Sequence, residues 1–479
     1  MKRRDFLKLS IAAGTGLIAS CGTLQKRNSV NSKPNIIFIL TDDQGWGDLA
    51  SYGHPYLKTP NIDRLAEEGT RFTQFYVNAT VCAPSRVAFM TGRYPARNNV
   101  HHIYLKEDFN IEHGVPDYLD HDAFTLADLM KKAGYTTGHI GKWHLEGRDI
   151  KSPPSNYGFD EWLVTHDASA SPSYIKRFNS TKHHVTLASH WIVDDALDFI
   201  ERHKNSDTPF YLNLWTLVPH GLLQPTDEEL SEYKYLKADP EDFKSWMNEY
   251  GHKAKDFTEQ MKVYCASMTS TDKALGRLLD YLDENGLSDN TLIVFTSDNG
   301  PEDYHVGDSA NAGVGSPGLS RGRKRSIYEG GIKVPCIVRW PRKIPRGRVA
   351  DNVWTGVDLM PTLASLTNTE PADTTQLDGE DVSDIWLGSD RKRNREIYWE
   401  WKYEVVGNQD YNPPQLAIRD GDWKLLCNPD GSSVELYNIP KDQAEKNNIA
   451  AKYPEITNKL KEKLLDWKKT IPERFERSE

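Results

Sequence analysis

The feature that most limits the fold of this chain is the continuous apolar run Asn35–Leu40 ended by a polar cluster, a format that three other segments repeat. Short runs of this kind are typical of strands that are buried on both faces of a parallel sheet. Segments with helical spacing of apolar residues lie between the runs. This alternation predicts an α/β fold in which helices flank a parallel or mostly parallel sheet. The expected strands are Asn35–Leu40, Tyr135–Ile140, Phe210–Leu217 and Thr291–Thr296, and the expected helices are Thr125–Ala133, Trp191–His203 and Glu259–Asn285.

Each expected strand is followed by polar residues of types that commonly bind ligands in proteins. The four clusters are Thr41-Asp42-Asp43, Gly141-Lys142-Trp143-His144, Pro219-His220 and Ser297-Asp298-Asn299-Gly300. In open α/β sheets the ligand lies beyond the carboxyl ends of the strands. We therefore expect the four clusters to meet at one edge of the sheet.

Two of these clusters predict a metal site. Asp42, Asp43, Asp298 and Asn299 offer oxygen ligands without histidine or thiolate, a set that selects Ca²⁺ or Mg²⁺. Calcium is favoured, because it takes about 6–8 oxygen ligands and so leaves positions for substrate oxygens. The Asp42-Asp43 pair alone would indicate a helix cap or a turn, and its pairing with the second cluster favours the metal.

A further segment places a cysteine at the start of a helix. Pro84 suits the first turn of a helix, and Gly92 suits its C-terminus, so Cys82 is expected at the N-terminus. Free N–H groups and the helix dipole favour an anion there, and Arg86 adds a positive charge one turn further on. An isolated cysteine would usually be a small buried apolar residue, whereas this arrangement indicates an oxyanion site beside a sulfur atom.

The length of 479 residues predicts two or three structural units. A second unit, 391–479, is expected after the charged run Arg391–Arg395, because short alternating runs and then a helix follow it. The segment 222–257 is expected to be a peripheral insertion, and the glycine-rich stretch 301–320 to line the site. The formal net charge of −10 argues against nucleic acid as a partner. The runs of the second unit are Glu396–Trp401, Leu416–Arg419, Trp423–Cys427 and Val434–Tyr437, followed by a helix over Pro454–Thr470.

Residues 1–32 have the character of an export signal and a polar tether. The segment around Arg3-Arg4 resembles a twin-arginine signal, and Ile18-Ala19-Ser20-Cys21 resembles a bacterial lipobox. This predicts a protein in the periplasm or at the cell surface, attached to a membrane through a lipidated Cys21. A cleaved secretory peptide, with Cys21 lost, is the alternative.

The remaining cysteines, expected as buried thiols because their spacing suits no metal, are Cys265, Cys336 and Cys427.

The segment Cys82-x-Pro84-Ser85-Arg86, followed by Thr91-Gly92-Arg93, resembles the signature of the type I sulfatases. These formylglycine-dependent enzymes belong to the alkaline-phosphatase-like superfamily. The resemblance runs from about Lys33 to the C-terminus. It implies a large α/β catalytic domain over 33–390, whose mostly parallel sheet is flanked by helices, and a small C-terminal antiparallel-sheet domain with a helix. Further matching segments are Gly141–His144, Asp298–Gly300, Lys324 with Glu329-Gly330-Gly331, Arg419–Leu425 and Glu435–Tyr437.

The resemblance also implies the chemistry. A formylglycine-generating enzyme would oxidise Cys82 to an aldehyde, one Ca²⁺ would bind, and the reaction would be hydrolysis of a sulfate ester on a sulfated oligo- or polysaccharide. The implied roles are charge stabilisation at the nucleophile by Arg86 and Lys142, proton abstraction during sulfate expulsion by His144, protonation of the leaving alcohol by His220, and stabilisation of the transferred group by Lys324.

Several of these assignments leave alternatives open. Lys142 and His144 alternate with Trp143, so on an extended stretch they would point the same way. Lys324 is the alternative acid for the leaving group. Arg323 and Arg325 flank Lys324 where the family has small residues, so either could point inward, or the segment could be a solvated basic face.

Two other functions stay open at this point. One is a phosphomonoesterase or phosphonate hydrolase of the same superfamily. Such enzymes commonly use threonine or serine with two metals held partly by histidine, and this chain lacks those residues at the matching positions. The other is a non-catalytic surface lipoprotein that binds sulfated glycans, with Cys82 left as a thiol.

Overall fold

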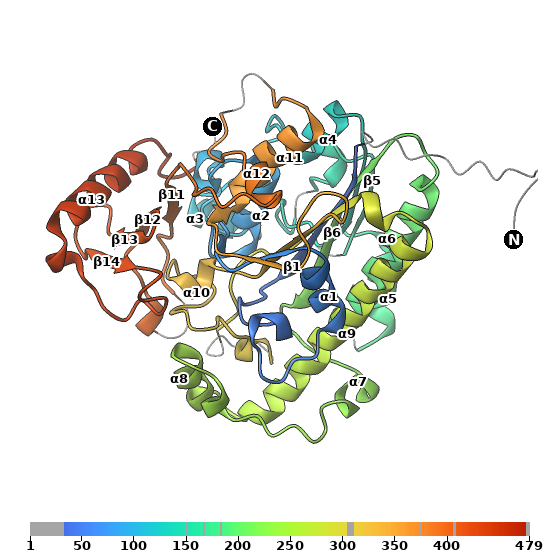
Figure 1. Ribbon diagram of the computed structural model, residues 1–479, viewed down its shortest axis with the longest axis horizontal. Coiled ribbons are helices and arrows are strands. Elements are labelled where there is room, and N and C mark those ends of the chain that lie inside the picture. The colour runs from blue at the N-terminus through green and yellow to red at the C-terminus, as the bar shows by residue number, and fades with distance from the viewer. Residues whose placement is uncertain are drawn as a thin grey trace, which may run out of the picture. The chain divides into compact units, whose positions relative to one another are not determined.

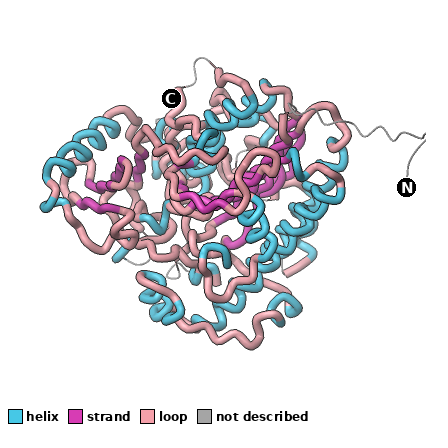
Figure 2. The backbone as a smooth tube through the Cα atoms, in the orientation of Figure 1, coloured by secondary structure: helices cyan, strands magenta, loops and turns pink. Residues whose placement is uncertain are grey.

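An eight-stranded sheet forms the centre of the fold (Figures 1 and 2). The computed structural model describes residues 33–149, 151–165, 168–182, 184–303, 311–372, 376–405 and 409–475. The strand order is β5-β4-β6-β1-β7-β8-β2-β9. The strands are β1 (Asn35–Asp42), β2 (Thr70–Phe72), β4 (Thr136–Gly141), β5 (Glu161–Val164), β6 (Phe210–Pro219), β7 (Thr291–Ser297), β8 (Cys336–Arg339) and β9 (Arg348–Ala350).

The strands from β5 to β7 are parallel to one another, as predicted. The four expected strands occur within two residues of their predicted ends. Apolar runs mark β1, β6 and β7, whereas β4 contains only one large apolar residue, Ile140, and was marked by the polar cluster that follows it. The other side of the sheet was not predicted. There β8 runs antiparallel to β7 and β2, and β9 is parallel to β2. The edge strands β2 and β9 are only three residues long and carry little periodicity.

Helices cover both faces of this sheet. Alternate residues of β1 enter two different hydrophobic clusters, as the pleat of a strand requires. Ile37 and Ile39 pack with α1, α6 and α9, whereas Phe38 and Leu40 pack with α2, α4 and α11. These helices are α1 (Pro60–Glu68), α2 (Cys82–Thr91), α4 (Leu126–Lys132), α6 (His184–His203), α9 (Phe257–Glu284) and α11 (Leu359–Thr367).

The predicted helices are present. Thr125 caps α4 in a capping box with Asp128, which explains why the helix begins there. Helix α6 begins seven residues before the predicted Trp191. The segment 222–257 holds α7 (Asp227–Ser231) and α8 (Trp246–Lys253) (Figure 1). Its apolar side chains form a separate cluster with those of the first half of α9. The shorter helices are α3 (Glu107–His113), α5 (Pro172–Ser180), α10 (Glu329–Ile332) and α12 (Ser383–Trp386).

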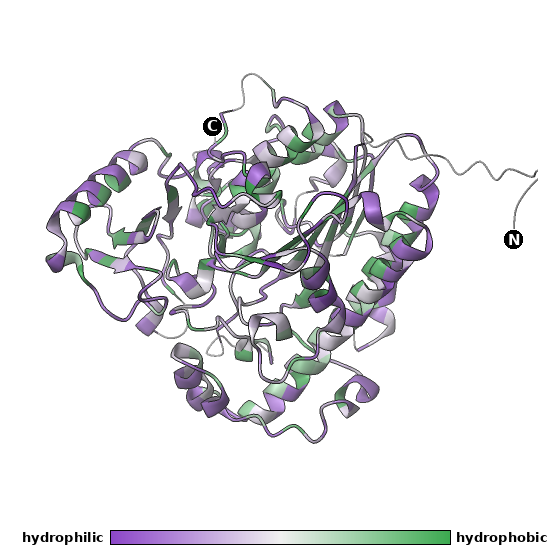
Figure 3. Ribbon diagram, in the orientation of Figure 1, coloured by the Kyte–Doolittle hydropathy of each residue, from purple (hydrophilic) through white to green (hydrophobic). Residues whose placement is uncertain are grey.

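The C-terminal part forms the predicted four-stranded antiparallel sheet. One face of this sheet packs under α13 (Pro454–Lys468), whose outer surface is hydrophilic in Figure 3. Its other face, with Trp399 and Ala417, joins the core of the large sheet. Residues 34–479 form one compact unit, so the boundary expected at residue 390 stays a prediction. The strands are β11 (Ile397–Glu400), β12 (Leu416–Asp420), β13 (Trp423–Cys427) and β14 (Glu435–Asn438), and a separate two-stranded sheet joins β3 (Phe75–Tyr76) to β10 (Trp354–Thr355).

Two sequence predictions concern the N-terminus and the cysteines. The export signal, the tether and Cys21 lie outside the described residues. Cys265, Cys336 and Cys427 are buried and unpaired, as predicted. In the part of the chain that the structure describes, no helix combines the length and the apolar character needed to cross a membrane.

The backbone conformation at the end of β4, just before Lys142, requires a glycine at position 141. Gly141 has φ +120°, and a Cβ there would lie 1.8 Å from the carbonyl oxygen of Trp215. We expect Gly141→Ala to lower the free energy of unfolding by about 3 kcal/mol or more, because the methyl group meets backbone that cannot move aside. Gly134→Ala is the matched control. Gly134 has φ +86° with nothing within 4 Å of the added Cβ, so it should cost only about 1–2 kcal/mol. Equal losses in urea unfolding would contradict the argument.

Candidate active site

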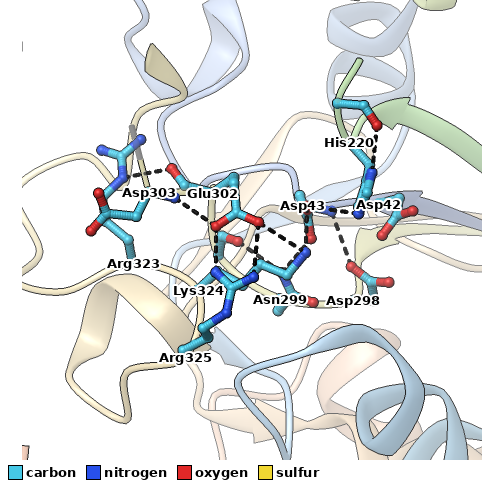
Figure 4. A network of polar contacts seen from close by, with 12 residues as sticks. Asp42, Asp43, His220, Asp298, Asn299, Glu302, Asp303, Arg323, Lys324 and Arg325 are labelled. Carbon is cyan, nitrogen blue, oxygen red and sulfur yellow. Dashed lines mark hydrogen bonds and ion pairs between the residues drawn. The ribbon is translucent and has the colours of Figure 1, made fainter. Parts of the chain in front are cut away.

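The polar clusters after β1 and β7 are joined at the carboxyl edge of the large sheet (Figure 4). The Asp43 N–H donates to Asp298 Oδ1 at 3.1 Å, and Asn299 Nδ2 donates to Asp43 Oδ1 at 2.8 Å. Asp43 has φ +68°, which turns the chain sharply after β1 and allows these contacts. The predicted meeting of the two clusters is confirmed by these contacts.

Arg86 connects this edge to helix α2. Its Nε and Nη2 atoms donate to Asp298 Oδ2 at 3.1 and 2.7 Å, and its Nη1 donates to the carbonyl oxygen of Lys142 at 3.1 Å. The guanidinium lies over the ring of Trp215, 4.9 Å from the ring centre, in a cation–π contact. Arg86 is fully buried, so these contacts hold it in one position.

Two lysines face the remaining carboxylates. Lys142 Nζ lies 2.5 Å from Asp42 Oδ2, and Lys324 Nζ lies 2.7 Å from Asp43 Oδ2. Burial acts to raise the pKa of Asp42, but the attraction of Lys142 and other nearby cations outweighs it and holds that pKa well below its usual range. Burial, followed by repulsion from Asp42, raises the pKa of Asp298 to about 7. The carboxylates and cations thus form one buried, coupled cluster.

Cys82 is the first residue of α2, as predicted. The helix ends at Gly92, which has φ +64° and donates its N–H to the carbonyl oxygen of Ala88. Cys82 Sγ and carboxylate oxygens of Asp42 and Asp298 all lie within 4.8 Å of one another. Burial raises the pKa of the Cys82 thiol to about 11, because the attraction of nearby lysines offsets it only in part. The sulfur therefore lies beside the acidic cluster, in its protonated form at neutral pH.

The acidic cluster has the character of a site for a hard cation. Asp42 Oδ1 and Asn299 Oδ1 are buried and accept no hydrogen bond from any described residue. A buried acceptor without a donor is costly, and a divalent cation would satisfy both atoms. Their neighbours Asp43 and Asp298 add further carboxylate oxygens, the ligands that calcium and magnesium prefer. The residues present fit a metal of this class.

The two histidines occupy different environments. His220 follows β6, and its Nε2 lies 3.8 Å from Asp43 Oδ2 while 41% of its side chain is exposed, so it borders both the cluster and solvent. His144 is buried and has φ +58°. The backbone is therefore not extended at His144, and the expectation that Lys142 and His144 point the same way stays a prediction. Its assignment to the site rests on its place in the sequence, two residues after Lys142.

The structure decides which cation of the 323–325 segment faces the carboxylates. Lys324 contacts Asp43, whereas Arg323 is buried and donates to the carbonyl oxygens of Glu302 and Gly313. Arg325 turns aside with φ +74° and pairs with the carboxylate of Glu302. The interpretation as a solvated basic face is wrong for this segment, since Arg323 and Lys324 are both buried.

Sequence analysis did not identify Glu302. Its carboxylate lies 3.4 Å from Lys324 Nζ and 2.5 Å from Arg325 Nη1 (Figure 4). Burial acts to raise its pKa, but the attraction of these two cations lowers the pKa to about 2. Its place in the stretch 301–320, which was expected to line the site, was the one signal in the sequence that could have identified it.

Gln44 follows the Asp42-Asp43 pair and uses its side-chain amide within the loop after β1. Its Oε1 accepts from the hydroxyl of Thr41, and its Nε2 donates to the carbonyl oxygen of Asp48.

Comparison with known proteins gives matches over nearly the whole described chain. Residues 34–369 match the model of the family described as Sulfatase, and residues 322–470 match the one described as N-sulphoglucosamine sulphohydrolase, C-terminal. The N-acetylgalactosamine-6-O-sulfatase of Bacteroides thetaiotaomicron is 30% identical, with 96% of this chain and 98% of that protein covered. The N-acetylgalactosamine-6-sulfatase of Canis lupus familiaris is 32% identical, with 79% and 71% covered.

Among solved structures, this chain resembles the crystal structure of Ps i-CgsB in complex with k-i-k-neocarrahexaose. The TM-score is 0.73 with 26% sequence identity, and 93% of this chain and 96% of that chain are covered.

Proposed function

This chain belongs to the sulfatase family, and we propose that it hydrolyses sulfate esters of a carbohydrate with a formylglycine made from Cys82 and one bound calcium ion. The observation that carries the proposal is the position of Cys82 at the start of α2, with its sulfur beside the carboxylates of Asp42 and Asp298. The modification requires a formylglycine-generating enzyme as a partner.

The two groups supply different chemistry. A hydrated formylglycine offers one hydroxyl to attack sulfur and a second that, once deprotonated, expels sulfate as the carbonyl re-forms, so a difficult hydrolysis is divided into two easier steps. Calcium supplies positive charge for the sulfate oxygens. The residues that would hold it are Asp42, Asp43, Asp298 and Asn299, and the two buried oxygens among them that accept no hydrogen bond support this assignment.

The cations of the chain stabilise the charge that develops. Arg86 and Lys142 are held by Asp298 and Asp42, the carboxylates that lie beside Cys82, so both cations are in place before substrate binds. Lys324, held against Asp43, stabilises the transferred group. Because their carboxylate partners fix these cations in the folded protein, little reorganisation accompanies the reaction.

Two histidines move the protons. His144 accepts the proton whose removal triggers sulfate expulsion. His220 protonates the leaving alcohol, since its side chain lies between the cluster and solvent and histidine is a common general acid. Lys324, the other candidate acid, is buried, which favours His220.

The relatives support a sulfated glycan as the substrate. Two of them carry the name of a sulfatase acting on N-acetylgalactosamine, and the structure of Ps i-CgsB holds an oligosaccharide. A polymer of this kind is met outside the cytoplasm, in agreement with the export-type N-terminus. We propose the periplasm or the cell surface as the location, with attachment to a membrane through lipidated Cys21.

The modification of Cys82 is tested by mass spectrometry. We expect the active protein to show an aldehyde in place of the Cys82 thiol, and Cys82→Ser to lose turnover by at least about 10³-fold, because serine has no second hydroxyl with which to expel sulfate. Cys265→Ser, at a buried cysteine of α9, should keep its activity. Full turnover by protein with an intact Cys82 thiol would refute the mechanism, whereas an intact thiol without turnover would favour the glycan-binding lipoprotein.

The metal is tested by elemental analysis. We expect one calcium ion per chain in the purified protein and its loss in Asp298→Ala, because that carboxylate lies at the centre of the oxygen cluster. Asp272→Ala is the matched control, since Asp272 is also buried but binds the first backbone amides of α1. Two zinc ions per chain, or activity unaffected by chelation, would favour the phosphatase alternative.

The substrate class is tested by comparing nitrophenyl sulfate, sulfated monosaccharides, and algal and glycosaminoglycan oligosaccharides. We expect kcat/KM to be at least about tenfold higher on the best glycan than on nitrophenyl sulfate, because contacts with sugar rings remote from sulfur lower the barrier. Shorter glycans should lose kcat as well as affinity. Turnover of nitrophenyl sulfate equal to that of every glycan would indicate a general arylsulfatase.

A further inference from the structure

The loop that carries Lys324 is closed by its own backbone. The Gly330 N–H donates to the carbonyl oxygen of Arg321 at 2.7 Å. A Cβ on Gly330 would lie 2.1 Å from the carbonyl oxygen of Gly322, and a Cβ on Gly331 would lie 2.0 Å from that of Ser326. The two ends of the 321–331 loop are therefore in direct contact, and Lys324 lies between them.

Glu329, at the end of this loop, is held by a lysine of the other sheet. Lys424 on β13 places its Nζ 3.1 Å from Glu329 Oε1, and both side chains are completely buried. The hydroxyl of Tyr76 donates to Glu329 Oε2 at 2.6 Å. Burial acts to raise the pKa of Glu329, but the attraction of Lys424 and of two other cations lowers that pKa to about 2. The buried carboxylate is thus charged and depends on Lys424.

Glu445 completes the connection. Its Oε1 lies 2.9 Å from Lys424 Nζ, and its Oε2 accepts the backbone N–H of Glu329 at 2.6 Å. Lys424 and Glu445 therefore hold both the side chain and the backbone of Glu329. Loss of one partner from such a buried pair leaves an uncompensated charge, so the geometry of this cluster depends on each member.

We propose that Lys424 is a positioning residue for hydrolysis: through Glu329 it fixes the 321–331 loop and so keeps Lys324 against Asp43. This inference rests on the proposed function, in which Lys324 stabilises the transferred group. It assigns the small C-terminal sheet a part in the reaction, although the residues proposed to touch substrate come from the large sheet and its loops.

A double-mutant cycle tests this role. The variants are Lys424→Met, Lys324→Ala and the double variant, and kcat and KM are measured on nitrophenyl sulfate. We expect Lys424→Met to lower kcat by about 10- to 100-fold, the scale of a small misplacement of a catalytic group. In the Lys324→Ala background the same change should lower kcat by less than about twofold, because the group that Lys424 positions is already absent. If the two losses multiply, or if Lys424→Met keeps full kcat, the proposal is overturned.

Lys468→Met separates positioning from loss of stability. Lys468 is also largely buried and pairs with Glu400 at 2.7 Å, on the last turn of α13. Its loss should lower Tm but change kcat by less than about twofold, since it does not contact the 321–331 loop. If Lys424→Met does not fold, Glu329→Gln replaces it in the cycle with the same expected outcome. Wild-type protein without sulfatase activity would refute the proposed function itself, and full activity of Lys324→Ala would overturn the role of Lys324 together with this inference.

Discussion

The structure depends on pairing buried carboxylates with buried cations at the carboxyl edge of the large sheet. An isolated charge taken out of water is strongly unfavourable, so a buried carboxylate requires a cation, a metal or several hydrogen-bond donors close by. Arg86 meets this requirement from α2, Lys142 from the end of β4, and Lys324 from the 321–331 loop. Segments far apart in the sequence are thereby held at one place, and Cys82 at the start of α2 lies among them.

Buried carboxylates are also paired with a buried cation where the small sheet meets the large one. Lys424 of the small sheet meets Glu329 and Glu445 in a buried cluster, and Glu329 ends the loop that carries Lys324. The two charged clusters share this loop. Charge pairing at the sheet junction and charge pairing at the site therefore constrain the same backbone.

The sequence predicted the parts of the fold that local pattern determines. The strands β1, β6 and β7 are largely apolar runs, and β4 is a short strand of mixed composition. The polar residues that follow these strands meet because parallel neighbours end at one edge. The three-residue edge strands β2 and β9 owe their existence to pairing partners distant in sequence, so no local pattern reveals them. The same limit applies within the site. Lys324 faces Asp43, while Arg325 adopts φ +74° and pairs with Glu302 instead. The spacing of the three basic residues in the sequence predicts neither the backbone angle nor the ion pair.

Charge balance also explains how an acidic protein can act on a sulfated carbohydrate. The chain carries a formal net charge of −10, which disfavours a polyanion at long range. Within the site, the four cations match the four carboxylates described above, so the metal-free cluster is close to neutral. A divalent cation held by the oxygen set would make this cluster locally positive, and Debye screening at physiological ionic strength limits the opposing field to about 8 Å. In this view the metal provides the positive charge that attracts a sulfate group, while the paired side chains keep the site folded before the metal binds.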